Sequence, residues 1–146
     1  SGKIGQINKG DQLFKNLSVE VLKKKPIFKI YGTKYKTRDG TCIRDYIHVT
    51  DISEIHYKVL SKINKYNIST VLNCGYGKGI SVYEAIQEFK KYANKHSKIV
   101  KFPKRKGDMV KIIASNKKLM RFIKWKPKFN NLRKIVKSCL IWEKRQ

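Results

Sequence analysis

Residues 39–52 read Asp-Gly-Thr-Cys-Ile-Arg-Asp-Tyr-Ile-His-Val-Thr-Asp-Ile, and the expected fold can be worked out from them. Asp39-Gly40 predicts a turn, because glycine adopts backbone conformations that other residues avoid. The residues from Ile43 to Val49 include strong β formers and predict a short strand. Asp51 and Glu54 have the spacing of a capping box, so a helix is expected to begin at Asp51.

Arg44 lies in the middle of this expected strand, where part of its side chain must be buried. A guanidinium group in such a place needs an anion, and the forked donors of arginine fit a phosphate well. The neighbouring Asp45 offers the simpler alternative of a structural ion pair. The residues themselves leave both interpretations open.

The segment from Tyr31 to Val49 resembles the signature of the UDP-glucose 4-epimerase family, which belongs to the extended short-chain dehydrogenases. The matching residues are Tyr31-Gly32-Thr33, Tyr35, Thr37 and Asp39-Gly40-Thr41-Cys42-Ile43-Arg44-Asp45-Tyr46-Ile47-His48-Val49. The resemblance implies that Arg44 contacts the diphosphate of a UDP-sugar and that Tyr46 lies at the same substrate site. It also implies an enzyme that interconverts UDP-glucose and UDP-galactose with NAD.

Residues 104–108, Lys-Arg-Lys-Gly-Asp, resemble the family's Arg-x-Gly-Asp element. The resemblance implies that Arg105 is a second diphosphate contact and that Asp108 accepts hydrogen bonds from the ribose hydroxyls. Ile112 occupies the position whose bulk helps decide whether N-acetylated sugars fit, and its intermediate size does not decide between glucose and N-acetylglucosamine. Glu20 departs from the family pattern, because an acid near the uracil and the diphosphate is unfavourable.

The pattern of apolar residues predicts an α/β fold with short strands and about five helices. Helices are expected at residues 11–24, at 51–64, after 81 with a capping box of Ser81 and Glu84, at 117–123 with Ser115 as cap, and at 131–144. Strands are expected at residues 27–31, 43–49, 70–74 and 99–102, with 110–114 extended. The resemblance covers essentially the whole chain but only the C-terminal, substrate-binding part of the family's architecture. Residues 1–146 are therefore interpreted as a C-terminal UDP-sugar-binding region that lacks the Rossmann N-terminal domain.

Residues 75–79, Gly-Tyr-Gly-Lys-Gly, separate an expected strand from an expected helix and could cradle a phosphate. Ile80 stands where the third glycine of a dinucleotide fingerprint belongs. We therefore interpret this segment, called the glycine turn below, as a structural strand-to-helix connection.

The catalytic parts of the family are missing from this sequence. No tyrosine is followed by a lysine four residues later, so the family's Tyr-x-x-x-Lys pair is absent. We expect no catalytic residue, no bound NAD and no activity for this chain by itself. The expected partners are a UDP-sugar and the missing Rossmann half, either a domain or the separate chain of a split enzyme. A homo-oligomer is left open.

Composition gives two further expectations. The formal net charge of +25 permits binding to polyanions, so a basic nucleic-acid-binding domain is an alternative. We favour a general compositional bias instead, because the basic residues are mostly dispersed lysines and arginine clusters are lacking. The three cysteines form no Cys-x-x-Cys pair, so neither a metal site nor a disulfide framework is predicted. Reduced thiols and short apolar runs suit a cytoplasmic protein without a membrane span.

The apolar residues of the expected helix at 51–64 are predicted to face inward; they are Ile52, Ile55, Val59, Leu60 and Ile63. This helix and the expected strand at 70–74 would lose their packing partner if the Rossmann half is absent. We therefore expect the isolated chain to expose an apolar face that promotes association.

Overall fold

The structure is a computed structural model that describes residues 12–146. Two parallel strands, β1 (Ile27–Tyr31) and β4 (Lys98–Phe102), pair in register from Ile27 with Lys98 to Tyr31 with Phe102. Strand β1 has the predicted bounds, and β4 begins one residue before the predicted 99–102. On one face of β1, Phe28 and Ile30 are almost completely buried.

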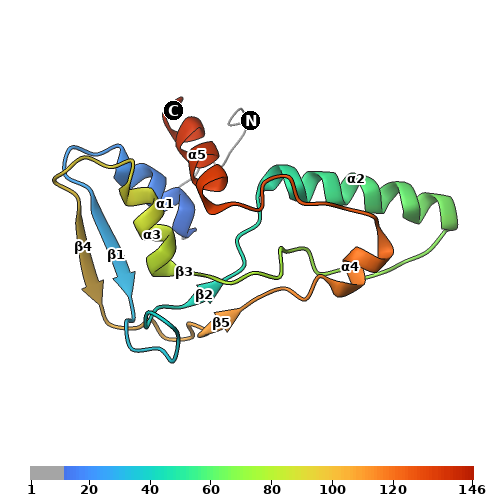
Figure 1. The fold of residues 1–146 in the computed structure, drawn as a ribbon, viewed down its shortest axis with the longest axis horizontal. Helices are drawn as coiled ribbons and strands as arrows, with labels where there is room; N and C mark the ends of the chain where they lie inside the picture. Colours follow the sequence, from blue (N-terminus) through green and yellow to red (C-terminus); the bar gives the residue numbers. More distant parts are fainter. Residues whose placement is uncertain (1–11) are drawn as a thin grey trace.

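Three helices, α1 (Leu13–Val21), α3 (Val82–Lys90) and α5 (Leu132–Glu143), form the first half of the molecule together with this strand pair (Figure 1). Helices α1 and α3 contact β1, and α5 packs against both of them. The buried core that they share consists of Leu17, Val21, Phe28, Ile30, Ala85, Ile86, Phe89, Val136 and Leu140. The fold is therefore α/β, with helices on one face of a small parallel sheet.

Helix α1 ends at Val21, earlier than the predicted Lys24, and the predicted first residue lies outside the described residues. The side chain of Glu20 bridges the turn that follows α1. Its carboxylate pairs with Lys23 and accepts a hydrogen bond from the backbone N–H of Ile27 at 3.1 Å. Glu20 thus connects the end of α1 to the beginning of β1, and its charge is compensated.

The second half contains α2 (Val49–Tyr66) and the short α4 (Lys117–Phe122), which lie beyond the strands at the other end of the molecule (Figure 1). Its buried apolar core consists of Ile55, Leu119, Ile123 and Trp125. The prediction that Ile55 faces inward is confirmed, since the residue is 1% exposed. The same prediction for Leu60 is wrong, because Leu60 is 58% exposed.

A sheet of three very short strands lies between the two halves. Strand β2 (Ile43–Arg44) pairs antiparallel with β3 (Ile80–Ser81) and parallel with β5 (Lys111–Ile112). Gly79 is required beside β2, because a Cβ atom there would lie 2.4 Å from Cγ2 of Ile43. The sheet brings three distant segments of the chain together.

Two of the predicted strands are wrong in extent or in kind. The strand predicted at 43–49 ends at Arg44, because the chain then turns into α2 at Val49. Residues 70–74 form no strand, since no described segment pairs with them and a strand needs a neighbour for its backbone hydrogen bonds.

Helix α2 is capped differently from the prediction. Nδ1 of His48 accepts a hydrogen bond from the backbone N–H of Thr50 at 3.0 Å, so His48 and not Asp51 is the capping residue. Because Nδ1 accepts, Nε2 carries the proton and donates to Oγ of Ser138 on α5 at 2.9 Å. The buried ring also stacks on Phe129, 4.2 Å between centroids. The start of α2 is thereby connected to α5.

Asp51 is fully buried and is used for tertiary contacts rather than for capping. Its carboxylate accepts hydrogen bonds from the backbone N–H groups of Lys128 at 3.1 Å and Phe129 at 2.9 Å, and from the hydroxyl of Tyr76. One side chain therefore joins α2, the glycine turn and the segment before α5.

Of the two caps predicted for α3 and α4, one is confirmed. The capping box of Ser81 and Glu84 is present on α3. The helix predicted at 131–144 is α5, and the side chain of Asn131 caps it by accepting from the N–H of Lys134. The predicted cap Ser115 on α4 is wrong, because Asn116 holds the capping position without a side-chain hydrogen bond. Among residues 12–146, the helices are too short or too polar to cross a membrane.

Replacing Asp51 by alanine should destabilise the protein strongly, because three donors would lose their acceptor in a buried site. Each unsatisfied donor costs about 1–3 kcal/mol, so we expect the free energy of unfolding to fall by about 3 kcal/mol or more. Urea denaturation would measure this loss. Tyr76→Phe, which removes one of the three donors, should cost clearly less. A loss below about 1 kcal/mol for Asp51→Ala would contradict the proposed connection.

The stability of the protein should depend on pH through His48. Burial lowers the pKa of the His48 imidazole from its ordinary value of 6.5, so the unfolded chain takes up a proton at this residue more readily than the folded protein. The contribution of the neutral ring to the free energy of unfolding is therefore present above pH 6.5. It is lost as the pH falls through the lower pKa of the folded protein.

Urea denaturation at several pH values between about 5 and 7.5 would measure this dependence. His48→Asn keeps a good capping group but does not titrate, so it should flatten the slope in that window. The exposed His96, changed to asparagine, is the matched control and should leave the slope unchanged. An unchanged slope in His48→Asn would refute the assignment.

Candidate functional site

The structure places Arg44 and Ile112 side by side, because they are register partners in β2 and β5. Nη1 of Arg44 donates to the backbone carbonyl of Met109 at 2.7 Å and to its own strand at the carbonyl of Ile43, 2.9 Å away. Met109 directly follows Asp108. Arg44 is thus attached to the segment that contains the other predicted binding residues.

The ion pair between Arg44 and Asp45, the simpler interpretation of the sequence, is wrong. The Asp45 carboxylate instead accepts hydrogen bonds from the backbone N–H groups of Tyr76 at 3.1 Å and Gly77 at 2.9 Å. Arg44 and Asp45 therefore reach different segments of the chain. The guanidinium group of Arg44 therefore has only carbonyl partners among the described residues.

Arg105 and Asp108 lie together on one turn after β4. Nε of Arg105 is 3.3 Å from Oδ2 of Asp108, and the Arg105 guanidinium lies over the ring of Tyr31 at 5.1 Å from its centroid. The Tyr31 ring in turn stacks on Phe102, with centroids 5.3 Å apart. Because β1 and β4 are parallel, their carboxyl ends meet at one edge of the sheet, and this edge holds the turn.

Two cavities adjoin the same edge. One of about 520 Å³ is lined by the turn after β1 and by the residues between Phe102 and Lys104. The other, of about 350 Å³, runs along α1 and β1 and is lined by Tyr31 and by several lysines. Glu20 also lines the second cavity, where Lys23 compensates its charge. The acid that departed from the family pattern is therefore already paired.

Tyr46 has different surroundings. Its ring packs on Phe14 with 4.5 Å between centroids, and burial raises the pKa of its hydroxyl to about 12. It lines a cavity of about 700 Å³ beside α3, whose lining does not include Arg44, Arg105 or Asp108. The structure thus brings the predicted arginines and Asp108 to connected segments, whereas it gives Tyr46 a separate environment. A role of Tyr46 in substrate binding stays a prediction.

The glycine turn does not fit the phosphates of a dinucleotide. The N–H groups of Tyr76 and Gly77, which would face such a ligand, are already bonded to the Asp45 carboxylate. The start of α3 is likewise occupied by the capping box of Ser81 and Glu84. An anion placed here would meet a carboxylate, so we derive no NAD chemistry from this turn. Within residues 12–146, no group of potential ligands could hold a metal ion.

Sequence reasoning did not identify the tertiary partners of Asp45, His48 or Asp51. Each partner lies at least 25 residues away from its acid or imidazole, apart from the capped Thr50. The only signal in the sequence was the concentration of polar side chains in one short stretch of otherwise apolar residues.

Several known proteins are similar to this chain in sequence and in architecture. A UDP-glucose 4-epimerase from Azospirillum brasilense is 34% identical over 145 residues, which is 99% of this chain and 42% of that protein. UDP-arabinose 4-epimerase 1 from Arabidopsis thaliana is 38% identical over 119 residues, 82% of this chain and 28% of that protein. The solved UDP-Glc/GlcNAc 4-epimerase of Campylobacter jejuni superposes with a TM-score of 0.82 at 38% identity, covering 97% of this chain and 43% of that one.

Over nearly its whole length the chain is similar to UDP-glucose 4-epimerases. It spans less than half the length of these relatives and corresponds to their C-terminal part. A solved UDP-glucose 4-epimerase from Stenotrophomonas maltophila, with bound NAD and formylated UDP-arabinopyranose, superposes with a TM-score of 0.86 at 29% identity, over 99% of this chain and 43% of that one. No family model matches the chain. The superpositions on these solved epimerases confirm the predicted fold class.

Proposed function

We propose that this chain is the UDP-sugar-binding part of an enzyme that interconverts UDP-glucose and UDP-galactose, and that it is not catalytic by itself. The observation that carries the proposal is the cluster at the carboxyl edge of β1 and β4. There Arg105 and Asp108 share one turn, and Arg44 is bonded to the residue after Asp108. The relatives, which are named as epimerases of UDP-sugars, support this substrate class.

In this proposal Arg44 and Arg105 donate hydrogen bonds to the diphosphate, and Asp108 accepts from the ribose hydroxyls. Charge-assisted hydrogen bonds of guanidinium groups to phosphate oxygens are short and strong. The pair of Arg105 and Asp108 must open first, which costs little because the Arg105 side chain is 57% exposed and exposed pairs contribute little. Ile112, at 46% exposure, is free to contact the sugar from the neighbouring strand.

The hydride chemistry must come from another part of the enzyme. Solved relatives from Brucella ovis and Thermus thermophilus are complexes with NAD, whereas the glycine turn here is occupied by Asp45. A Rossmann half, on the same chain or on a separate one, would supply the cofactor and the catalytic tyrosine and lysine. The second half of this molecule exposes Tyr57 at 74%, Leu60 at 58% and Val71 at 82%, which suits burial against such a partner.

Calorimetric titration of the chain with UDP at moderate salt tests the binding site. Saturable binding is expected, and Arg105→Ala should weaken it by about 1.5–3 kcal/mol through loss of one charge-assisted contact. Arg133→Ala, which removes an exposed arginine from α5, is the matched control for net charge and should bind like the parent protein. Equal weakening by both changes would indicate general charge attraction. Absence of binding by the parent protein would contradict a UDP site that forms without the Rossmann half.

Complementation tests the catalytic part of the proposal. Mixing this chain with the Rossmann half of a related epimerase, NAD and UDP-galactose should produce UDP-glucose, whereas neither protein should do so separately. Arg44→Ala should reduce this turnover at least tenfold, since it removes a diphosphate contact of about 1.5 kcal/mol or more. If neither Arg44→Ala nor Arg105→Ala changes the turnover rate, the substrate binds elsewhere.

A further inference from the structure

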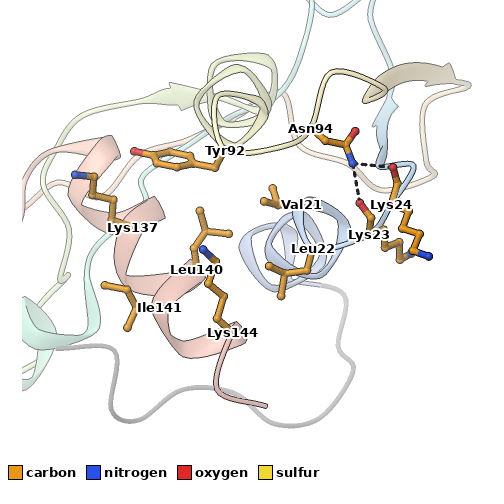
Figure 2. A pocket seen from close by; sticks show the side chains of 10 residues that line it. All are labelled: Val21, Leu22, Lys23, Lys24, Tyr92, Asn94, Lys137, Leu140, Ile141 and Lys144. Atoms are coloured by element: carbon orange, nitrogen blue, oxygen red, sulfur yellow. Dashed lines mark hydrogen bonds between the residues drawn. The ribbon is translucent and has the colours of Figure 1, made fainter.

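A groove of about 630 Å³ lies where α1, α3 and α5 meet (Figure 2). Val21 and Leu22 of the α1 end face Leu140 and Ile141 of α5 across it. Leu22 is 44% exposed and Ile141 is 46% exposed, although both are aliphatic. None of the residues proposed to bind a UDP-sugar lines this groove, so its apolar floor needs another explanation.

Two sets of contacts fix the segments that form the groove. Nζ of Lys15 on α1 is 2.8 Å from Oε2 of Glu143 on α5, and both side chains are at least nine-tenths buried. In the loop after α3, Nδ2 of Asn94 donates to the backbone carbonyls of Lys23 at 3.2 Å and Lys24 at 2.7 Å (Figure 2). The walls are therefore fixed before any partner arrives, which lowers the entropic cost of binding.

Every charged residue in the lining is a lysine. Lys23 is paired with Glu20, whereas Lys24, Lys137 and Lys144 have no side-chain hydrogen bond or ion pair among residues 12–146. Three unpaired cations thus surround an apolar floor. A ligand that matches the groove must combine an apolar surface with several anionic groups.

The spacing along α5 indicates the shape of this ligand. Leu140, Ile141 and Lys144 lie three, four and seven residues after Lys137, so the four residues form one stripe along α5 and its C-cap Lys144. An apolar centre flanked by cations is the arrangement with which one helix selects another helix of opposite charge. Amphipathic helices bind in grooves through anchors of the same spacing.

We propose that this groove binds an acidic amphipathic helix of a partner protein. The apolar stripe of the partner helix covers Leu22 and Ile141, and its carboxylates face Lys24, Lys137 and Lys144. A second copy of this chain fits less well, because lysines would meet lysines. A polynucleotide would satisfy the lysines but would leave Leu22 and Ile141 uncovered. A flat bilayer would not reach the floor between the helices.

The probe for this proposal is a fluorescein-labelled peptide of about 20 residues, long enough to form a helix, with leucine at heptad positions a and d and glutamate at e and g. Anisotropy titrations use the whole chain at about 0.3 M salt, which screens exposed charges that are far apart. We expect saturable binding with one peptide per chain. A twin peptide with glutamine in place of the glutamates should bind at least about tenfold more weakly.

Matched variants separate the groove from the general charge of the protein. Leu22→Ser and Ile141→Ser keep the net charge and should each weaken binding about five- to tenfold, whereas Val71→Ser, another exposed aliphatic residue, should not. The pair Lys137→Gln with Lys144→Gln should weaken binding at least tenfold, whereas Lys117→Gln with Lys124→Gln removes the same charge from outside the lining and should have less than a twofold effect. Circular dichroism checks that all the variants fold.

Three results would overturn the proposal. Equal losses in the groove variants and in their controls would show adsorption of the acidic peptide to a basic surface. A dimer of the unliganded chain that Ile141→Ser abolishes would assign the groove to a second copy. Binding to vesicles with anionic lipids that Leu22→Ser and Ile141→Ser abolish would assign it to a membrane. The UDP titration is independent of these results, because Arg44, Arg105 and Asp108 are unchanged.

Discussion

The relative position of the two halves depends on the buried carboxylate of Asp51. It accepts hydrogen bonds from the glycine turn, through Tyr76, and from two backbone N–H groups of the segment before α5. None of these partners is a cation, so the charge is stabilised by hydrogen bonds in a site from which water is excluded. A single side chain at the start of α2 therefore fixes where three distant segments lie. The hydrogen bond between His48 and Ser138 of α5 reinforces the same connection.

The candidate site depends on strand direction. Because β1 and β4 run in parallel, the turn after each strand lies at the same edge, where Arg105 stacks over Tyr31. At the end of β2, Arg44 bonds to the residue after this turn, whereas Asp45 bonds to the glycine turn. Two guanidinium groups and one carboxylate thus lie on connected segments, beside cavities of about 520 and 350 Å³. The groove between α1, α3 and α5 is a separate surface, with its own apolar floor and its own lysines.

Local patterns predicted those parts of the fold whose stability is local. Strands β1 and β4 and the capping box of Ser81 and Glu84 follow from residues that are close in sequence. The strand predicted at 70–74 failed because a strand requires a neighbour, and periodicity does not reveal whether a neighbour exists. Asp51 was predicted as a helix cap because its spacing from Glu54 is suitable, but three distant donors compete for the same carboxylate. Leu60 was predicted to be buried from the period of α2, yet the described residues do not cover that part of the helix.

The sequence by itself determined the family, the α/β class and the identity of Arg44, Arg105 and Asp108 as candidate binding residues, because the motifs that carry this information are contiguous. It also determined that the family's Tyr-x-x-x-Lys pair is missing from the chain. Only the tertiary structure decided which groups pair with which. Arg44 bonds to the Met109 carbonyl and not to Asp45, and the glycine turn is closed by that same Asp45. The physical reason is that hydrogen-bond partners are chosen by distance and direction in space, and residues more than 30 positions apart leave no trace of their proximity in a single sequence.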